Sequence, residues 1–139
     1  MKKILLKNAN LVLENKIEKA TVLVCEDKIE KIFSKDSDLS QITYDELIDL
    51  EGKYLGPAFV DVHVHGADGA DAMDIDEEAL RRISKYLAKE GTANFLVTTL
   101  TSTKDELKNV LEIAGKLQNK EIDGANIFGV HMEGPYFAI

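Results

Sequence analysis

The sequence predicts an α/β protein in which a group of short strands is followed by a βαβαβ unit. Three observations lead to this prediction: apolar runs rich in β-branched residues before residue 50, two amphipathic helical stretches after residue 74, and an apolar strand that returns at Phe59, Phe95 and Phe128. The intervals between these phenylalanines are 36 and 33 residues. A strand–helix alternation of this period is typical of parallel strands joined by right-handed crossovers.

The first 55 residues contain four short runs that favour β-strands. They are ILLKN, NLVLEN, KATVLVCED and KIEKIFSK, and the turn-prone NAN, ENK and EDK separate them. Alternating apolar runs bounded by such turns are typical of hairpins. We interpret this part of the chain as a small antiparallel β unit.

The first strand of the βαβαβ unit is expected at 58–65, where AFVDVHVH alternates strictly. Because successive side chains of a strand point to opposite faces, one face carries the valines and should pack against helices. The other face carries Phe59, Asp61, His63 and His65. Two histidines two residues apart therefore project from the same face.

The helices are expected at 75–90 and 103–117. Asp74 with Glu77 forms a capping box for the first helix, and Gly91 suits the position after its end. Apolar residues in both stretches recur at helical spacing. Ser102 or Thr103 caps the second helix.

The second and third strands are expected at 94–100 and 127–133. Alternation in the third strand puts one set of residues (Gly129, His131 and Glu133) on one face and a second set (Phe128, Val130 and Met132) on the other. The unit is compatible with an open doubly wound sheet and with a (β/α)₈ barrel. No glycine-rich nucleotide-binding motif follows any of the strands.

Composition excludes several classes of function. The 139-residue chain has a formal charge of −8, which argues against binding to a nucleic-acid backbone. The N-terminal MKKILLKNAN has too short an apolar run for a signal peptide, and no run approaches the roughly 20 residues of a membrane span. Cys25 is the single cysteine, which fits a reducing compartment. We therefore expect a cytoplasmic protein without membrane or nucleic-acid partners.

The chemically distinctive residues are His63, His65 and Glu133. Two imidazoles and a carboxylate at the carboxyl ends of parallel strands suit a divalent metal such as zinc, iron or manganese, with a position left for water. A histidine on a strand is more often an ordinary core residue, but Asp61 makes the same face too polar for a plain core. His131 either hydrogen-bonds within the site or simply packs.

Two further groups of polar residues lie near these strand ends. Asp71, in the loop GADGADAMD, either orients a ligand or makes an Asx turn, and the turn is the commoner role of such an aspartate. Thr98, Thr99 and Thr101 end the second strand. Because β-branched threonine is ordinary strand material, we interpret them as structural rather than as the lining of a polar pocket.

Three blocks of the sequence resemble N-acetylglucosamine-6-phosphate deacetylases of the amidohydrolase superfamily. These blocks are LGPAFVDVHVHGADGADAMD, GTANFLVTTLTS and GVHMEGPYF, in that order. The first is generic, since dihydroorotases and adenine deaminases share it, whereas His-x-Glu-Gly-Pro is more particular to the sugar deacetylases. Ala58 departs from the pattern, because the family usually has glycine after this proline.

The resemblance implies a metal-dependent (β/α)₈ barrel with a small β-sandwich. Residues 1–55 would form part of the sandwich, and 56–139 an incomplete barrel that is truncated after its third strand. Glu133 matches the glutamate that ligates the catalytic metal, and His63 and His65 match a pair that holds a second metal in some members. The substrate implied is N-acetylglucosamine 6-phosphate, a small sugar phosphate, and the parent enzyme would be a homo-oligomer.

The resemblance leaves part of the family's machinery unmatched. Two later histidine ligands, the catalytic aspartate and the sugar-phosphate contacts have no position in the chain, so we assign no catalytic residue. We expect the chain by itself to be inactive. Two alternatives stay open: another amidohydrolase, similar to dihydroorotase or adenine deaminase, and a non-catalytic truncated fragment.

Overall fold

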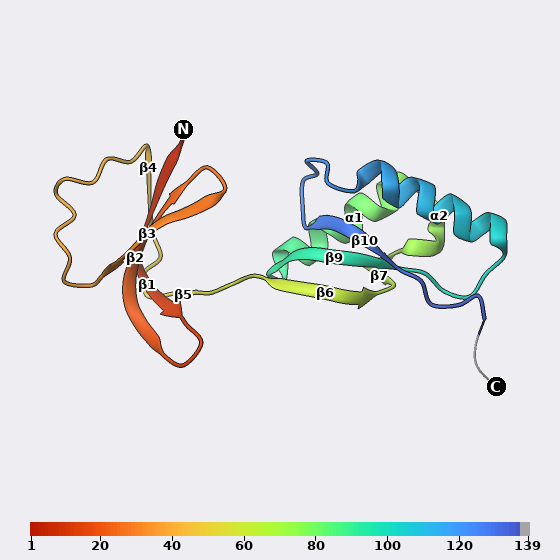
Figure 1. Ribbon diagram of the computed structural model, residues 1–139, viewed down its shortest axis with the longest axis horizontal. Coiled ribbons are helices and arrows are strands. Elements are labelled where there is room, and N and C mark those ends of the chain that lie inside the picture. Colours follow the sequence, from red (N-terminus) through yellow and green to blue (C-terminus); the bar gives the residue numbers. More distant parts are fainter. Residues whose placement is uncertain (137–139) are drawn as a thin grey trace. The chain divides into compact units, whose positions relative to one another are not determined.

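The computed structural model of the protein describes residues 1–136 and divides into two compact units (Figure 1). Unit 1 comprises Met1–Pro57 and unit 2 comprises Ala58–Ile139. Phe137, which ends the GVHMEGPYF block, lies outside the described residues. Within the described part of the chain, no helix is both long and apolar enough to cross a membrane.

Unit 1 is a five-stranded mixed sheet. Its strands are β1 (Lys3–Val12), β2 (Ile17–Cys25), β3 (Lys28–Ser34), β4 (Glu46–Asp49) and β5 (Tyr54–Leu55). The strand order is β3-β2-β1-β4, and β5 also pairs with β1 (Figure 1). The pairs β1–β2 and β2–β3 are antiparallel, but β4 and β5 run parallel to β1. The predicted antiparallel unit is therefore confirmed for β1–β3, whereas the parallel pairing of β4 and β5 departs from the prediction.

The predicted turn at NAN is a bulge inside one long strand. The register of β1 against β2 shifts between Leu6 and Ala9, and Asn8 takes a left-handed φ of 58°. Asparagine tolerates this conformation, so the chain adds a residue without ending the strand. The Asn8 amide donates to the Asp49 carboxylate on β4. The backbone N–H of Glu51 and this amide hold the pKa of Asp49 below its usual value.

Both faces of the unit 1 sheet are apolar. Leu5, Leu23 and Phe33 form a cluster on one face, which is covered by Leu39 and Ile42 from the loop after β3. The opposite face contains a hollow of about 290 Å³. Its lining is almost entirely aliphatic: Leu6, Leu11, Val12, Leu13, Val22, Val24, Ile29, Ile32, Leu55, Gly56 and Pro57.

Unit 2 contains the predicted βαβαβ arrangement. Strands β6 (Phe59–Val64), β9 (Thr92–Thr98) and β10 (Asn126–His131) form a parallel sheet in the order β10-β9-β6. Helices α1 (Glu77–Lys89) and α2 (Lys104–Leu117) lie on one side of it (Figure 1). A short hairpin of β7 (Gly66–Ala67) and β8 (Ala70–Asp71) and the 3₁₀ turn η1 (Ala72–Asp74) follow β6. The predicted parallel pairing in sequence order is confirmed.

Helix α1 begins at Glu77, two residues later than predicted, and Asp74 does not cap it. Asp76 is the N-cap, and its carboxylate accepts the N–H of Glu78. Asp74 instead belongs to a capping box with Asp71, which starts the 3₁₀ turn. Ile75 lies between the two segments with a left-handed φ of 55°, so the 3₁₀ turn cannot run on into the helix. The expected Asx-type role of Asp71 is confirmed.

The other predicted helix ends agree with the structure. Thr103 caps α2 in a capping box with Glu106. Hydrogen bonds from the hydroxyls of Ser102 and Thr103 lower the pKa of the Glu106 carboxyl. Gly91 follows α1 with a φ of 87°, a conformation that favours glycine at this position.

The valines of β6 do not form the buried face that alternation predicts. Val60 and Val62 are each 55% exposed, and only Val64 contacts the core beneath the helices. This core is built mainly on β9 and β10, with Phe95 and Ile127 fully buried. The two helices pack mainly on β9 and β10 and leave most of the valine face of β6, at one edge of the sheet, uncovered.

A bulge in β10 also changes which residues face the helices. The register against β9 shifts between Ile127 and Gly129, so Phe128 is the extra residue and is 38% exposed. Ile127 takes its place in the core, and beyond the bulge Val130 packs on the core as predicted. The prediction that Phe128 shares a face with Val130 was therefore wrong.

The chain leading into β10 is attached to α1 at Ser84. The Ser84 hydroxyl donates to the Ala125 carbonyl at 2.6 Å, and the Ala125 N–H donates to the Ser84 carbonyl at 2.9 Å. Gly124 permits this approach, since a Cβ there would lie 2.3 Å from the Ser84 hydroxyl oxygen. Ser84 and Ala125 are both fully buried, so their polar atoms depend on each other.

We expect Ser84→Ala to lower the free energy of unfolding by about 1–3 kcal/mol, because it leaves the Ala125 carbonyl buried without its hydroxyl donor. Chemical denaturation followed by circular dichroism measures this change. Ser40→Ala, at an exposed loop position, serves as the control and should stay within about 0.5 kcal/mol of the wild type. Equal effects of the two changes would contradict the role given to Ser84.

Candidate metal centre

The structure brings His63, His65 and Glu133 together at the carboxyl ends of β6 and β10. The His63 Nε2 lies 3.0 Å from a Glu133 carboxylate oxygen, and the His65 Nε2 lies 3.3 Å from the same oxygen. The two Nε2 atoms are 3.1 Å apart. The three atoms thus form a nearly equilateral triangle, and they come from strands that flank β9.

This donor set fits a divalent metal ion. Ligand atoms at about 2.0–2.1 Å from a tetrahedral ion lie about 3.3–3.4 Å from one another, close to the separations of the triangle. A neutral imidazole and a carboxylate each offer a lone pair, so three such atoms in contact repel unless a cation or a proton lies among them. The side chains are half-buried to exposed, which leaves room for a further ligand.

A bulge near the end of β6 shapes the histidine side of the triangle. The register against β9 shifts between Asp61 and Val64, so Val62 and His63 fall outside the regular pairing. The Val62 carbonyl is 2.9 Å from the His131 Nδ1 and accepts its hydrogen bond across the width of β9. The strict alternation assumed for this strand does not hold at this point, although His63 and His65 still converge.

His131 lies beside the triangle without belonging to it. Its ring packs against the ring of His63 with centroids 4.6 Å apart and planes tilted by 41°. Because the Nδ1 donates to the Val62 carbonyl, the neutral ring carries its proton there. The two roles left open for His131 are therefore both present: it forms a hydrogen bond and it packs.

Asp61 and the Nδ1 of His65 define the surroundings of the two imidazoles. The Asp61 carboxylate accepts the backbone N–H of His63 at 3.0 Å, so it supports the bulge. It is not one of the three candidate metal ligands. The His65 Nδ1 is buried and has no hydrogen-bond partner among residues 1–136. Packing and the contact with Glu133 therefore hold the His65 ring.

Two buried hydroxyls, on Thr98 at the end of β9 and on Thr99 directly after it, reach the chain segments on either side. The Thr98 Oγ1 accepts the backbone N–H of Val64 at 2.9 Å, and the Thr99 Oγ1 accepts the backbone N–H of Glu133 at 3.2 Å. Both threonines are fully buried. Both threonines were interpreted from the sequence as ordinary strand residues, so these contacts were not predicted. Two consecutive threonines at the end of the middle strand were the only sequence signal.

Gly134 and Gly66 each follow a donor residue at a close approach of the backbone. Gly134 has a φ of 92°, and a Cβ there would lie 2.4 Å from the Thr101 Oγ1. A Cβ on Gly66 would lie 2.2 Å from the Ala70 carbonyl oxygen. A side chain at Gly134 would displace Glu133, and a side chain at Gly66 would displace His65.

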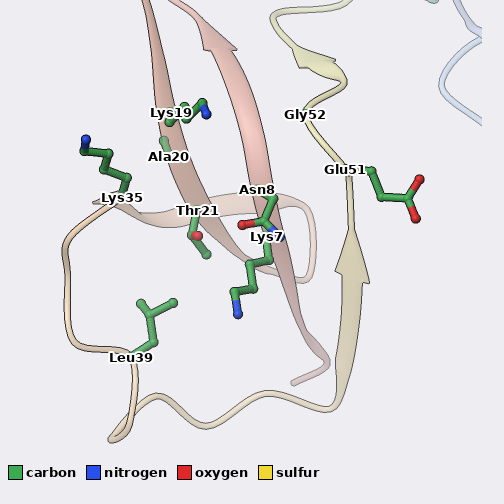
Figure 2. Close-up of a pocket in the computed structure, with 9 residues that line it drawn as sticks. All are labelled: Lys7, Asn8, Lys19, Ala20, Thr21, Lys35, Leu39, Glu51 and Gly52. Carbon is green, nitrogen blue, oxygen red and sulfur yellow. The ribbon is translucent and has the colours of Figure 1, made fainter.

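A second hollow, of about 370 Å³, lies in unit 1 and does not include the triangle. Lys7, Lys19 and Lys35 line it, together with Asn8 and Thr21. Figure 2 shows the three amino groups pointing in different directions, and the carboxylate of Glu51 pointing away from them. The lysines thus form no converging set of donors.

Curated relatives match the chain over part of their length. N-acetylglucosamine-6-phosphate deacetylase of Vibrio furnissii is 39% identical over 83 residues, which are 60% of this chain and 21% of that protein. The deacetylase of the same name from Lysinibacillus sphaericus is 32% identical over 76% of this chain and 29% of its own. N-acetylgalactosamine-6-phosphate deacetylase of Escherichia coli O157:H7 is 33% identical over 63% of this chain and 23% of its own.

The chain is a homologue of part of these sugar-phosphate deacetylases. It spans between about a fifth and a third of the length of these relatives. No protein-family model matches it. The resemblance seen in the three sequence blocks is thus confirmed.

Solved structures agree with this relationship at the level of the fold. The crystal structure of N-acetylglucosamine-6-phosphate deacetylase from Pasteurella multocida superposes with a TM-score of 0.84 at 24% identity, over 99% of this chain and 35% of that one. L-hydantoinase from Arthrobacter aurescens superposes less closely, with a TM-score of 0.53 at 25% identity, over 83% of this chain and 25% of that one. The α/β fold class is confirmed, with amidohydrolases among the structural neighbours.

We expect Gly134→Ala to disrupt the glutamate side of the triangle more than a matched change at Gly69. Both glycines have a positive φ, which costs alanine about 1–2 kcal/mol, but a Cβ on Gly69 has no atom within 4 Å. Amide hydrogen exchange should show lost protection at the Glu133 N–H in Gly134→Ala only. Retained protection in that variant would mean that the contact with Thr101 does not constrain Glu133.

Proposed function

We propose that the chain forms part of a metal-dependent deacetylase acting on N-acetylglucosamine 6-phosphate. The observation that carries this proposal is the convergence of His63, His65 and Glu133 within 3.0–3.3 Å, at the positions that match the family's metal-ligand motifs. The homology to the sugar-phosphate deacetylases supports the substrate class. The products would be glucosamine 6-phosphate and acetate.

The three residues would hold zinc, iron or manganese, each in a defined role. His63 and His65 would bind through Nε2 as neutral ligands, and Glu133 would supply one negative charge. When bound, such an ion polarises a carbonyl oxygen and lowers the pKa of a bound water, which suits hydrolysis of an acetamide.

The other polar residues near the triangle would hold the ligands rather than react. Asp61 is engaged with the N–H of His63, and His131 with the carbonyl of Val62. We therefore assign no general base among the described residues. The chain would depend on residues outside this set to complete the ligand shell, to move the proton and to bind the phosphate.

We infer that unit 2 is the beginning of a (β/α)₈ barrel. Three features support this: parallel strands in sequence order, both helices on one face, and the donor side chains at the carboxyl ends. Residues 56–139 would then be an incomplete barrel that ends after the third strand. The exposed Val60 and Val62 on the edge strand would be covered by the remainder.

We infer that residues 1–55 are part of a β-sandwich. The support is the aliphatic hollow on one face of the unit 1 sheet, which leaves Ile29 and Ile32 exposed. A sheet that is apolar on both faces normally packs against a second layer, because exposed apolar patches of this kind weaken solubility.

For metal binding, we expect the chain to bind Co²⁺ weakly, and Glu133→Gln to bind it more weakly still. Weak binding follows from three protein ligands on exposed strand ends, and the further loss of affinity follows from removal of the anionic donor. The loss should exceed the ~10–100-fold that is typical of residues supporting a ligand. Titration followed by visible absorption measures it. Glu112→Gln, an exposed carboxylate on α2, is the control and should leave binding unchanged.

For catalysis, we expect residues 1–139 alone to release no acetate from N-acetylglucosamine 6-phosphate above a metal-only control. The product of the complete reading frame should do so, and should lose activity in Glu133→Gln. N-acetylgalactosamine 6-phosphate and dihydroorotate are assayed in parallel, which separates the sugar substrates and the cyclic-amide alternative. Turnover by residues 1–139 that Glu133→Gln abolishes would show that these residues carry the reaction unaided.

A further inference from the structure

Thr98 ends the middle strand β9 and Thr99 follows it, and their hydroxyls bond to the backbone on opposite sides of this strand. Thr98 reaches Val64, which lies between His63 and His65 in the sequence. Thr99 reaches the backbone N–H of Glu133. Each hydroxyl therefore contacts the backbone beside the candidate metal ligands, Thr98 on the side of the two histidines and Thr99 on the side of Glu133.

The hydroxyls accept backbone N–H groups at points where the regular pairing is interrupted, next to the bulge in β6 and beyond the end of β10. In β6 the bulge disturbs pairing before Val64, and the Thr98 Oγ1 serves as the acceptor of its N–H while donating to the Leu96 carbonyl at 3.3 Å. Strand β10 ends at His131, two residues before Glu133. The Thr99 N–H donates to the His131 carbonyl at 3.1 Å, and its hydroxyl then holds Glu133.

Burial gives these contacts their rigidity. Both threonines are 0% exposed, and threonine has few rotamers because it is branched at Cβ. Leaving the backbone N–H of Val64 or Glu133 without an acceptor would cost free energy. Each N–H therefore stays where its threonine hydroxyl accepts the hydrogen bond. The Thr98 and Thr99 side chains thus constrain the distance between the imidazoles and the carboxylate.

We propose that Thr98 and Thr99 are positioning residues for the metal centre, Thr98 for the histidine pair and Thr99 for Glu133. This inference rests on the proposed metal site and goes beyond it, because neither threonine is a ligand. It predicts that removing either hydroxyl weakens metal binding while the methyl groups are dispensable.

The test measures Co²⁺ affinity of the full chain by visible absorption. Thr98→Val and Thr99→Val keep the shape of the side chain and remove the hydroxyl, and each should weaken binding by ~10–100-fold. Thr98→Ser and Thr99→Ser keep the hydroxyl and should bind as the wild type does. Thr92→Val, a buried threonine at the other end of β9, is the matched control and should also bind as the wild type does.

A double-mutant cycle distinguishes positioning from general stability. If Thr99 acts through Glu133, Thr99→Val should add little further loss in a Glu133→Gln background, whereas Thr98→Val should still weaken binding there. A purely structural role would give Thr99→Val the same effect in both backgrounds. That result would overturn the proposal for Thr99.

A measurement on the wild-type chain covers the case in which the valine variants do not fold. Coupling is reciprocal, so Zn²⁺ must strengthen the hydroxyl contacts by the factor that they contribute to its binding. Hydrogen exchange at the Val64 and Glu133 amides should therefore slow on adding Zn²⁺, and exchange at the Thr21 amide in unit 1 should not. Metal binding without slower exchange at Val64 and Glu133 refutes the inference, whereas absence of any metal binding refutes the proposed function instead.

Discussion

The parallel pairing of β9 with a strand on each side is the constraint on which the rest of unit 2 depends. The outer strands do not pair with each other, yet they supply the two halves of the donor triangle. Their separation is fixed through β9 and through the hydrogen bond from His131 to the Val62 carbonyl. Helix α1, helix α2 and the attachment of Ala125 at Ser84 serve to keep this strand order and register.

The triangle combines groups that repel one another in the absence of a cation or a proton. The two imidazole nitrogens and the carboxylate oxygen lie 3.0–3.3 Å apart, so a shared cation, or a proton on an imidazole nitrogen, turns these contacts into attraction. Hydrogen bonds around the triangle add to the support of the two strand ends. The His131 ring donates to the Val62 carbonyl, and the His63 N–H donates to the Asp61 carboxylate.

Both edge strands of the parallel sheet expose apolar side chains. On β6, the outward valines are exposed, and on β10 a bulge turns Phe128 toward solvent. Parallel strands are normally buried on both faces. The exposed apolar residues at both edges therefore support the proposal that unit 2 is part of a larger barrel.

The sequence by itself determined the elements whose signals are local. The period of the strands, the stripes of the helices, the caps at Thr103 and Gly91 and the His-x-His spacing all depend on residues a few positions apart. Only the tertiary structure decided where bulges interrupt alternation, which strand is an edge, and that Thr98 and Thr99 hold the two sides of the site. The physical reason is that a strand's register and a hydroxyl's partner are set by the neighbouring strand, which lies about 30 residues away in the sequence.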